Sequence, residues 1–387
     1  MLSVAECERI ARVVCDVPVT AVAPDVSVVI PVHNEPERLL RRCTESLLAQ
    51  TFTGEIEALL VDDASTDDAL ARCEAIAREY NEKADAASSD KLRVRVRVFS
   101  LRENSGSAAV PRNIGVAYAR GKYISFLDSD DYMIERTYET LFRIAEEDRL
   151  DLILFGCTVD VVNVADGKHE IVSTTDHPLG EDVVALGVTD LAGIGYNILG
   201  KVTGGVTEKF FARTMFTENP ELEFPHLRYL DDTVVGQLSV PFANRVRYIA
   251  DCLGRKTGDG GRKFYHLILA ESFSTWLEIK TRLERSGRLT HEVERLMDNL
   301  QLKRTATDLR NTTDSDIVVY ILNKIKTVFL PNTFLTTAPQ REFVEASLRD
   351  MIRLWRKITP ERFCELNGIV WKGMPEEELL SVWDLKA

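Results

Sequence analysis

The sequence predicts an α/β fold, in which a mostly parallel sheet is followed by a helical C-terminal region. In the first 133 residues, short apolar segments alternate with segments of helical spacing. Strands that alternate with helices, at connections of under roughly 30 residues, are typical of a parallel sheet covered by helices on both faces. Beyond residue 264 the apolar residues recur every three or four positions, which indicates helices alone.

The expected strands are short, rich in β-branched and aromatic residues, and bounded by turn residues. They are residues 26–32, 56–61, 92–101, 123–127 and 150–162, and a hairpin is expected near Asp166-Gly167. In the third strand valines alternate with arginines, as in a strand with one solvated face.

The expected helices carry apolar residues on one side. In the α/β part they are residues 2–16, 35–50, 65–83, 107–120 and 134–147; in the C-terminal part they are residues 264–286, 289–310, 314–328, 340–357 and 375–383. Because proline fits only the first turn of a helix, the fourth of these helices should begin near Pro111 rather than at Ser107.

Length and composition bound the organisation of the chain. Its 387 residues suffice for two domains, and 45% hydrophobic with 28% charged residues is typical of a soluble globular protein. We predict an N-terminal helical extension at residues 1–25, an α/β domain at 26–257 and a helical region at 258–387.

Charge and cysteine content exclude several classes of function. A formal net charge of −13 without a Lys/Arg block argues against nucleic acid as the main partner. No apolar run approaches the roughly 18 residues of a membrane span, and the N-terminus lacks the pattern of a signal peptide. The seven scattered cysteines favour reduced thiols and no zinc site. We expect a cytoplasmic protein without a transmembrane segment; peripheral contact with the inner face of the membrane stays open.

Three carboxylates follow the strand at 123–127 within four residues, namely Asp128, Asp130 and Asp131. Open α/β sheets bind ligands at the carboxyl ends of their strands. Carboxylates crowded there repel one another unless a cation joins them, and a divalent ion can bridge to substrate phosphates. The alternative is an acidic loop in which Asp130 or Asp131 caps the next helix.

Polar residues also follow the preceding strands. Asn34 comes after the first strand and is expected to cap the next helix, while Asp62 or Asp63 ends the second strand and is expected to bind a base or ribose, or to cap a helix. Arg112 lies at a helix entrance, where it forms an anion site or else faces solvent. Because parallel strands end at one edge of the sheet, these groups should meet in a single crevice.

In this order the motifs resemble those of family 2 glycosyltransferases of the GT-A fold, of the non-processive soluble type. The matching segments are residues 28–35, 60–67, 103–106, 112–115 and 126–131. The resemblance is specific over residues 26–133, extends weakly to about residue 255, and leaves the C-terminal third uncovered.

The resemblance implies a donor site for a UDP-sugar. Asp128 would meet the ribose or sugar, and Asp130 would coordinate Mn²⁺ or Mg²⁺ together with the diphosphate. The remaining donor-site residues would be Pro31, His33 and Glu35 in the nucleotide pocket, Asp62 or Asp63 at the uracil edge, and Arg112 beside the uridine or diphosphate.

An inverting transfer also needs a base that deprotonates the acceptor hydroxyl. The candidate is Asp232, oriented by Asp231, in a segment resembling the Glu-Asp pair that follows Phe-Pro in the family; alternatively both cap a helix beginning at Thr233. Arg255 and its neighbour Lys256 would clamp the diphosphate as a mobile lid, or belong to a solvated basic loop.

The resemblance therefore predicts an inverting, metal-dependent enzyme that moves a hexose or N-acetylhexosamine from a UDP-sugar to a hydroxyl acceptor. The acceptor would be a cell-envelope or capsular glycan, a teichoic-type polymer or a lipid-linked precursor. The alternative is a catalytically silent GT-A protein that binds nucleotide or mediates assembly. A homo-oligomer formed through the C-terminal helices is a further hypothesis.

Overall fold

The computed structural model describes residues 2–17, 23–87, 92–165, 168–176, 188–190, 204–258, 265–333 and 346–372. The chain divides into two compact units. The first consists of Met1–His226 and Asp231–Gly261, and the second of Leu227–Leu230 and Arg262–Ala387.

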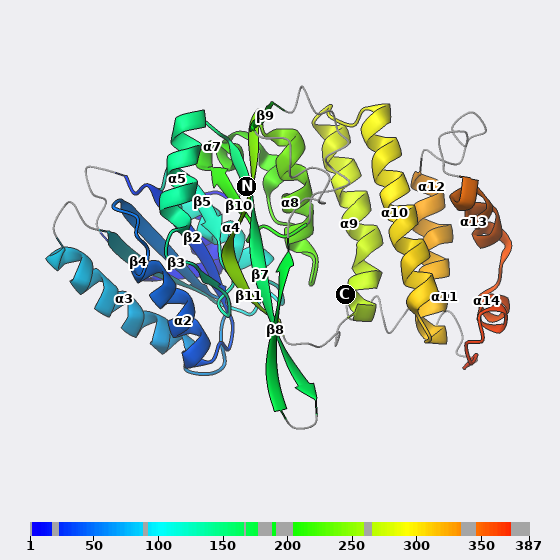
Figure 1. Cartoon of the computed structure of the whole chain (residues 1–387), viewed down its shortest axis with the longest axis horizontal. Coiled ribbons are helices and arrows are strands. Elements are labelled where there is room, and N and C mark those ends of the chain that lie inside the picture. The colour runs from blue at the N-terminus through cyan, green and yellow to red at the C-terminus, as the bar shows by residue number, and fades with distance from the viewer. Residues whose placement is uncertain are drawn as a thin grey trace. The chain divides into compact units, whose positions relative to one another are not determined.

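A single sheet forms the centre of the first unit (Figure 1). The order of its strands is β1-β4-β3-β2-β5-β10-β7-β11-β6. Its strands are β1 (Ala11–Cys15), β2 (Val26–Val32), β3 (Glu55–Asp62), β4 (Arg93–Leu101), β5 (Tyr123–Phe126), β6 (Tyr132–Met133), β7 (Leu152–Ala165), β8 (Lys168–Asp176), β9 (Val188–Asp190), β10 (Lys209–Ala212) and β11 (Arg245–Gly258). The block β4-β3-β2-β5 is parallel, as is the pair β7 and β11, whereas β10 runs antiparallel to both of its neighbours. The predicted α/β class with a mostly parallel sheet is confirmed, and β7 and β8 pair antiparallel around the predicted hairpin.

The chain reverses its direction of travel across the sheet at β2. The strands β3 and β4 follow on one side of it, while β5 pairs on the other side. In open α/β sheets, a crevice opens at such a switch point, outside the carboxyl ends of the strands. Pro31 fits here because β2 pairs with β5 only as far as Val29, so the N–H that proline lacks leaves no ladder bond unmade on that side.

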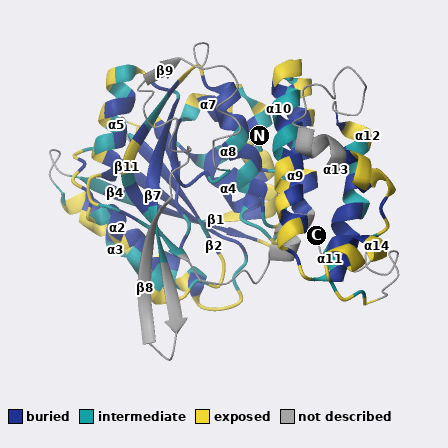
Figure 2. Ribbon diagram, turned by 45° about the vertical axis from the view of Figure 1, so that its right-hand side comes forward, coloured by how far each residue is buried: buried dark blue, intermediate teal, exposed yellow. Residues whose placement is uncertain are grey.

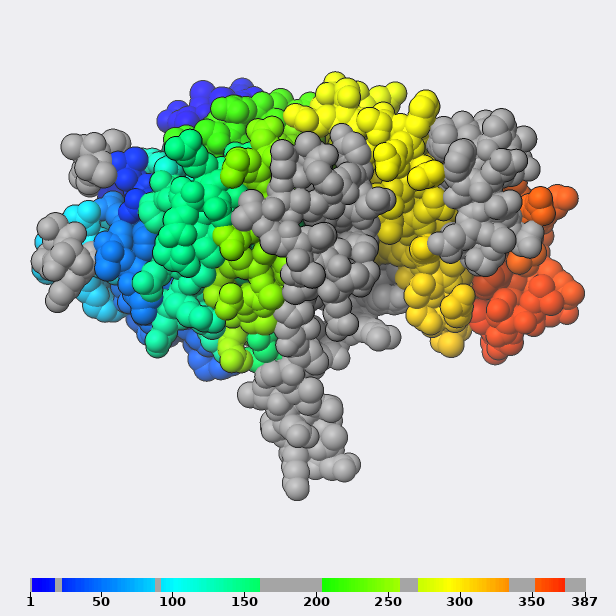
Figure 3. Space-filling model, turned by 45° about the horizontal axis from the view of Figure 1, so that its top comes forward, coloured from blue at the N-terminus to red at the C-terminus, as the bar shows by residue number. Residues whose placement is uncertain are grey.

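Helices cover both faces of this sheet. One face packs against α2 (Glu37–Leu48), α3 (Ala69–Ala86) and α5 (Thr137–Asp148) in a continuous apolar core, and the other packs against α4 (Ala109–Tyr118). Figure 2 shows the central strands almost entirely buried, whereas α2 and α3 have exposed outer sides. Figure 3 shows the surface of α5 beside that of α2. The start of α5 is bound to the residues just after α2, since the buried N–H of Tyr138 donates to Gln50 Oε1 at 3.0 Å. The shorter helices are α1 (Val4–Ile10), α7 (Arg213–Glu218) and η2 (Pro220–Leu222), and α8 spans Asp231–Phe242.

The helix α4 lies unusually close to β2. A Cβ atom at Gly115 would stand 2.2 Å from Val29 Cγ1, so only glycine permits this approach. The helix begins at Ala109, which places Pro111 in its first turn, as predicted. The close packing of α4 against β2 fixes the position of Arg112 relative to the sheet.

The prediction of one helix over residues 2–16 is wrong in its second half. A capping box between Ser3 and Glu6 starts α1, which ends at Ile10, and the next residues form β1. β1 pairs antiparallel with β4, whose outer edge would otherwise be unpaired. Hydrogen bonds to the open backbone groups of β4 therefore favour an extended chain here over the helix that the spacing of the apolar residues predicts.

The predicted solvated face of β4 is also wrong for Arg97, which is 1% exposed. Its guanidinium donates to Glu57 Oε2 at 3.2 Å, to Asp16 Oδ1 at 2.6 Å and to the carbonyl of Tyr118 at 2.7 Å. A buried charge is tolerated because each of these acceptors compensates for lost water.

The second unit is helical. Its elements are α9 (Tyr265–Arg285), α10 (His291–Asn311), α11 (Ser315–Lys324), the π-helical η3 (Ile325–Phe329), α12 (Leu330–Asn332), α13 (Ala346–Lys357) and α14 (Pro360–Leu366). The first three predicted helices are confirmed, the fourth is confirmed from residue 346 onward, and the prediction at 375–383 lies outside the described residues. Among the described residues, no helix combines the length and apolar character needed to cross a bilayer.

Candidate active site

The acidic loop after β5 lies at the switch point of the sheet. Its residues lead into β6, and α5 begins only at Thr137, so the alternative that Asp130 or Asp131 caps a helix is wrong. Ser129 Oγ donates to Glu35 Oε2 at 2.7 Å. This bond joins the loop after β5 to the loop after β2, across the crevice that the topology predicts.

Two residues from distant parts of the chain hold the acidic loop. The backbone N–H of Thr257 donates to Asp131 Oδ1 at 2.7 Å, and its hydroxyl donates to the carbonyl of Asp130 at 2.9 Å. Arg42 donates to the same carbonyl and to the Thr257 hydroxyl, and its guanidinium lies 4.7 Å from the centre of the Tyr132 ring. The loop is therefore fixed through its backbone and through Asp131.

Crowding raises the pKa of the loop carboxyls. Burial, followed by the negative charges of Asp128 and Glu35, raises the pKa of Asp130 to about 6. Burial, followed by Asp128 and Asp130, raises the pKa of Asp131 to about 8. A cation close to these groups would relieve the repulsion.

Arg112 joins this loop to the first turn of α8. Its Nη2 donates to Asp128 Oδ1 at 2.8 Å and its Nη1 to Asp231 Oδ2 at 2.7 Å. Burial lowers the pKa of the guanidinium, but the two carboxylates outweigh burial and hold the pKa above its ordinary value. Arg112 is 5% exposed, so the alternative of a solvated helix face is wrong.

The neighbouring residue on α4, Asn113, anchors the chain upstream of α8. Its side chain donates to the carbonyl of Phe224 and accepts from the N–H of Phe224, both at 2.8 Å. One turn of α4 thus holds both Phe224 and Asp231.

The candidate base Asp232 occupies the first turn of α8, which begins at Asp231 rather than at Thr233. Burial raises the pKa of Asp232 to about 6, Arg112 and Lys209 act to lower it, and Asp231 acts to raise it. Lys209 is fully buried on β10 and donates to the carbonyl of Gly205. A carboxyl with this pKa is ionised at neutral pH and basic enough to accept a proton.

The predicted uracil-edge residues differ in their contacts. Asp63 Oδ1 accepts from the N–H of Ser105 at 2.8 Å, and burial raises the pKa of this carboxyl. Asp62 accepts from Ser100 Oγ at 3.1 Å and from the N–H of Ser65 at 3.3 Å, so its carboxylate stabilises the turn after β3. His33 Nδ1 lies 3.0 Å from the carbonyl of Asp63, on the same loop surface.

The prediction that Asn34 caps the next helix is wrong. The N-cap of α2 is Pro36, which makes no side-chain cap bond. Asn34 instead has a φ of 51° and accepts from the N–H of Thr66 at 2.8 Å. Its side chain therefore ties the loop after β2 to the loop after β3.

Arg255 and Lys256 are strand residues. The predictions that they belong to a mobile lid or to a solvated loop are therefore both wrong. They lie in β11, paired in parallel with β7. Arg255 Nη1 lies 3.4 Å from Asp160 Oδ1, and Lys256 forms an ion pair with the buried Glu208.

Sequence reasoning missed several residues that shape the site. Asn113 lies inside the matching segment 112–115, so its position beside Arg112 could have marked it as a site residue. Arg42 and Lys209 carry no local signal, because only the fold brings them to the crevice. The same holds for Thr257.

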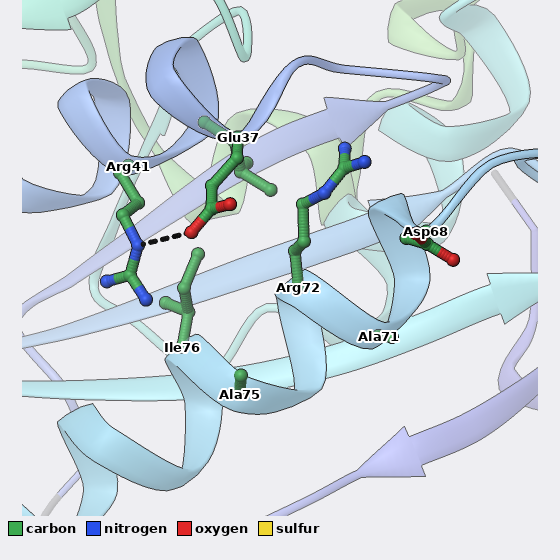
Figure 4. Close-up of a pocket in the computed structure, with 8 residues that line it drawn as sticks. Glu37, Arg41, Asp68, Ala71, Arg72, Ala75 and Ile76 are labelled. Atoms are coloured by element: carbon green, nitrogen blue, oxygen red, sulfur yellow. Dashed lines mark hydrogen bonds and ion pairs between the residues drawn. The ribbon is translucent and has the colours of Figure 1, made fainter.

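A pocket of about 320 Å³ lies elsewhere on this unit, between α2 and α3 (Figure 4). Arg41 on its wall is paired with Glu37 at 3.1 Å, and Arg72 is paired with Asp67 at 3.2 Å. None of the predicted site residues lines it, and its arginines are neutralised by these neighbours.

The acidic loop offers carboxylate oxygens, which are the donors that a hard divalent cation prefers. Within the described ranges, no three His, Cys, Asp or Glu side chains form a group that could hold an ion. Mg²⁺ is commonly bound by one or two carboxylates together with substrate phosphates, and Asp130 is the residue that would hold such an ion here.

Comparison with known proteins shows similarity to glycosyltransferases. Residues 27–194 match the family model described as glycosyl transferase family 2. Glycosyltransferase GlyG of Streptococcus pneumoniae is 37% identical over 129 residues, which cover 33% of this chain and 38% of that protein. The poly(ribitol-phosphate) beta-N-acetylglucosaminyltransferase TarP of Staphylococcus aureus is 35% identical over 130 residues, covering 33% of this chain and 35% of TarP. The chain thus matches little more than a third of the length of these relatives.

Solved structures show the same fold over more of the chain. The crystal structure of Staphylococcus aureus TarS 1–349 in complex with UDP-GlcNAc has a TM-score of 0.66 at 18% identity, covering 89% of this chain and 90% of that chain. A second structure of TarS 1–349 gives a TM-score of 0.65 with the same coverage. The predicted GT-A fold is confirmed.

Proposed function

We propose that this chain, whose residues 27–194 match the family model of glycosyl transferase family 2, is an inverting, metal-dependent glycosyltransferase. It moves a hexose or N-acetylhexosamine from a UDP-sugar to a hydroxyl acceptor. The observation that carries the proposal is Arg112, which joins Asp128 of the acidic loop to Asp231 beside the candidate base. Donor-binding and proton-accepting groups are thereby held on one crevice.

The reaction is a single displacement. Asp232 accepts the proton of the acceptor hydroxyl, the acceptor oxygen forms a bond to the anomeric carbon, and the bond from that carbon to the diphosphate breaks. The electron pair of the broken bond stays on UDP, and attack from the opposite face inverts the anomeric centre. The raised pKa of Asp232, about 6, suits it to take the proton at neutral pH.

Asp130 would hold Mn²⁺ or Mg²⁺ at the diphosphate, where the ion neutralises charge on the departing group. Arg42 and Thr257 fix the backbone of Asp130. Both of these contacts use the backbone of Asp130, so neither of them occupies the carboxylate that we assign to the ion.

The acceptor is proposed from the relatives. TarP and a glucosyltransferase of Bacillus spizizenii, which is 35% identical over 130 residues, are both named for action on poly(ribitol phosphate). TarS has been solved with UDP-GlcNAc. We therefore place the acceptor among cell-envelope polymers, with teichoic-type polymers first and other envelope or lipid-linked glycans next.

Calorimetric titration of the purified chain with UDP, with and without Mn²⁺, tests the donor site. GDP and ADP serve as controls for selectivity toward the uracil of the nucleotide. Uridine-selective, metal-dependent binding supports the proposal, and absence of binding by all three nucleotides contradicts it. Transfer from UDP-[¹⁴C]glucose or UDP-[¹⁴C]GlcNAc to envelope polymers then distinguishes an active enzyme from a silent protein that binds nucleotide only.

A further inference from the structure

The helical second unit contains a carboxylate that binds three consecutive backbone N–H groups. Glu271 on α9 is 5% exposed. Its Oε1 accepts from the N–H of Arg228 at 2.7 Å, and its Oε2 accepts from Tyr229 at 2.7 Å and from Leu230 at 3.2 Å. Hydrogen bonds from N–H groups to an ionised carboxylate are roughly twice as strong as neutral ones, so this contact fixes the peptide backbone firmly.

The bound segment leads directly to the candidate base. Leu230 is followed in the chain by Asp231 and Asp232, which open α8. Adjacent Cα atoms are held about 3.8 Å apart by the planar peptide unit. A shift of the backbone at residues 228–230 therefore moves the first turn of α8 as well.

Two further anchors flank this segment within the first unit. Asn113 holds Phe224 through both of its backbone groups, and Arg112 holds the carboxylate of Asp231. Both ends of the chain from Phe224 to Asp231 are therefore bound by α4.

We propose that Glu271 is a positioning residue for Asp232, and that the helical unit contributes to catalysis through it. The inference rests on the proposed function and deepens it, because it gives the C-terminal third of the chain a part in the proton transfer. Glu271 acts through the backbone. A displacement of a catalytic group by about 1 Å can lower a rate by about 10²-fold.

The test compares Glu271→Gln with the unmodified chain and with Glu278→Gln. Glutamine keeps the shape of the side chain but turns one oxygen into a donor, which opposes the N–H groups. Glu278 lies on the same helix and is paired with Arg282 at 2.7 Å, so its variant controls for the loss of one charge from α9. Glu271→Asp, which keeps the carboxylate on a shorter stem, is the conservative variant.

We expect kcat of Glu271→Gln to fall by about 10- to 100-fold, with the UDP dissociation constant and the donor KM within twofold of the unmodified chain. Glu271→Asp should recover part of kcat, and Glu278→Gln should match the unmodified chain. Amide hydrogen exchange of the peptide covering residues 224–235 should be faster in Glu271→Gln. If Glu271→Gln is too unstable to assay, the same comparison is made with Glu271→Asp, whose kcat should then lie below that of the control.

Three outcomes overturn the inference. An unchanged kcat in Glu271→Gln, with only a lower melting temperature, assigns Glu271 to stability alone. A parallel loss of kcat and UDP affinity assigns it to the fold of the donor site. If the unmodified chain neither binds UDP nor transfers sugar, the proposed function fails and this inference fails with it.

Discussion

Arg112 and Asp231, 119 positions apart in the chain, form an ion pair of 2.7 Å whose side chains are both about 6% exposed. The same guanidinium binds Asp128 at 2.8 Å, so one cation attracts two carboxylates that would otherwise repel each other. The arginine therefore sets the spacing between the donor loop and the first turn of α8.

Replacing this arginine should destabilise the protein. Arg112→Met leaves two carboxylates without their partner, and breaking a buried pair costs about 3–5 kcal/mol of unfolding free energy. Chemical denaturation measures the loss. The double variant Arg112→Met/Asp231→Asn should lose less unfolding free energy in total than the sum of the losses in the two single variants. Strict additivity would contradict the pairing.

Replacing Asp130 should remove metal-dependent nucleotide binding. The carbonyl of this residue, rather than its carboxylate, is what Arg42 and Thr257 hold, so Asp130→Ala should keep the circular dichroism spectrum of the unmodified chain. Calorimetry with UDP and Mn²⁺ provides the measurement. The exposed Asp68, changed to alanine, is the control. Retained Mn²⁺-dependent affinity in Asp130→Ala would move the metal to another residue.

Replacing Asp232 should separate binding from transfer. Asp232→Asn keeps the shape of the side chain but cannot accept the acceptor proton, so transfer should fall by roughly 10²–10⁴-fold while UDP still binds. Single-turnover assays at saturating donor measure the change. Full transfer by this variant would place the base elsewhere.

Transfer should depend on pH through the same carboxyl. Because the pKa of Asp232 is raised to about 6, its basic form accumulates as pH rises through 6, and kcat should fall on the acid side of that value. Lys209 acts to lower this pKa, so Lys209→Met should move the acid limb of the kcat profile to higher pH. A limb that stays in place would show that Lys209 has no influence on the base.

The same shift has the opposite sign for folding. A carboxyl whose pKa is higher in the folded state binds protons more tightly there, so its contribution to the free energy of unfolding is full below its ordinary pKa of 3.8 and is lost as pH rises through about 6. At pH 7.5, Asp232→Asn should therefore be at least as stable as the unmodified chain, and denaturation curves at pH 5 and 7.5 check this.

The contact between α4 and β2 gives a prediction on packing. Gly115→Ala should lower stability by about 1–3 kcal/mol, since its Cβ would stand 2.2 Å from Val29 Cγ1. Val29→Ala in the same chain should recover part of that loss. If Gly115→Ala instead stabilises the protein, as replacing glycine by alanine does in an unconstrained helix, the close approach is refuted.

Apart from the two-residue strand β6, the order of elements from residue 26 to residue 162 was predictable from the sequence. Apolar segments of strand length, helical spacing between them and turn residues at their ends are local signals, and β2 was predicted with its observed limits. The edge strand β1 was not predictable, because its extended form depends on pairing with β4.

For the candidate site, the sequence by itself determined which groups lie at the strand ends. Asp63 and Asp128 follow from motifs at strand ends, because the carboxyl ends of parallel strands share one edge, and Arg112 follows from a motif at the start of the helix α4. Only the tertiary structure decided what each group touches. Arg112 meets Asp231, and Glu271 meets the backbone before Asp231, across separations of 119 and about 40 residues. No local pattern encodes such contacts, since they depend on how whole helices pack and on which buried charges must find partners.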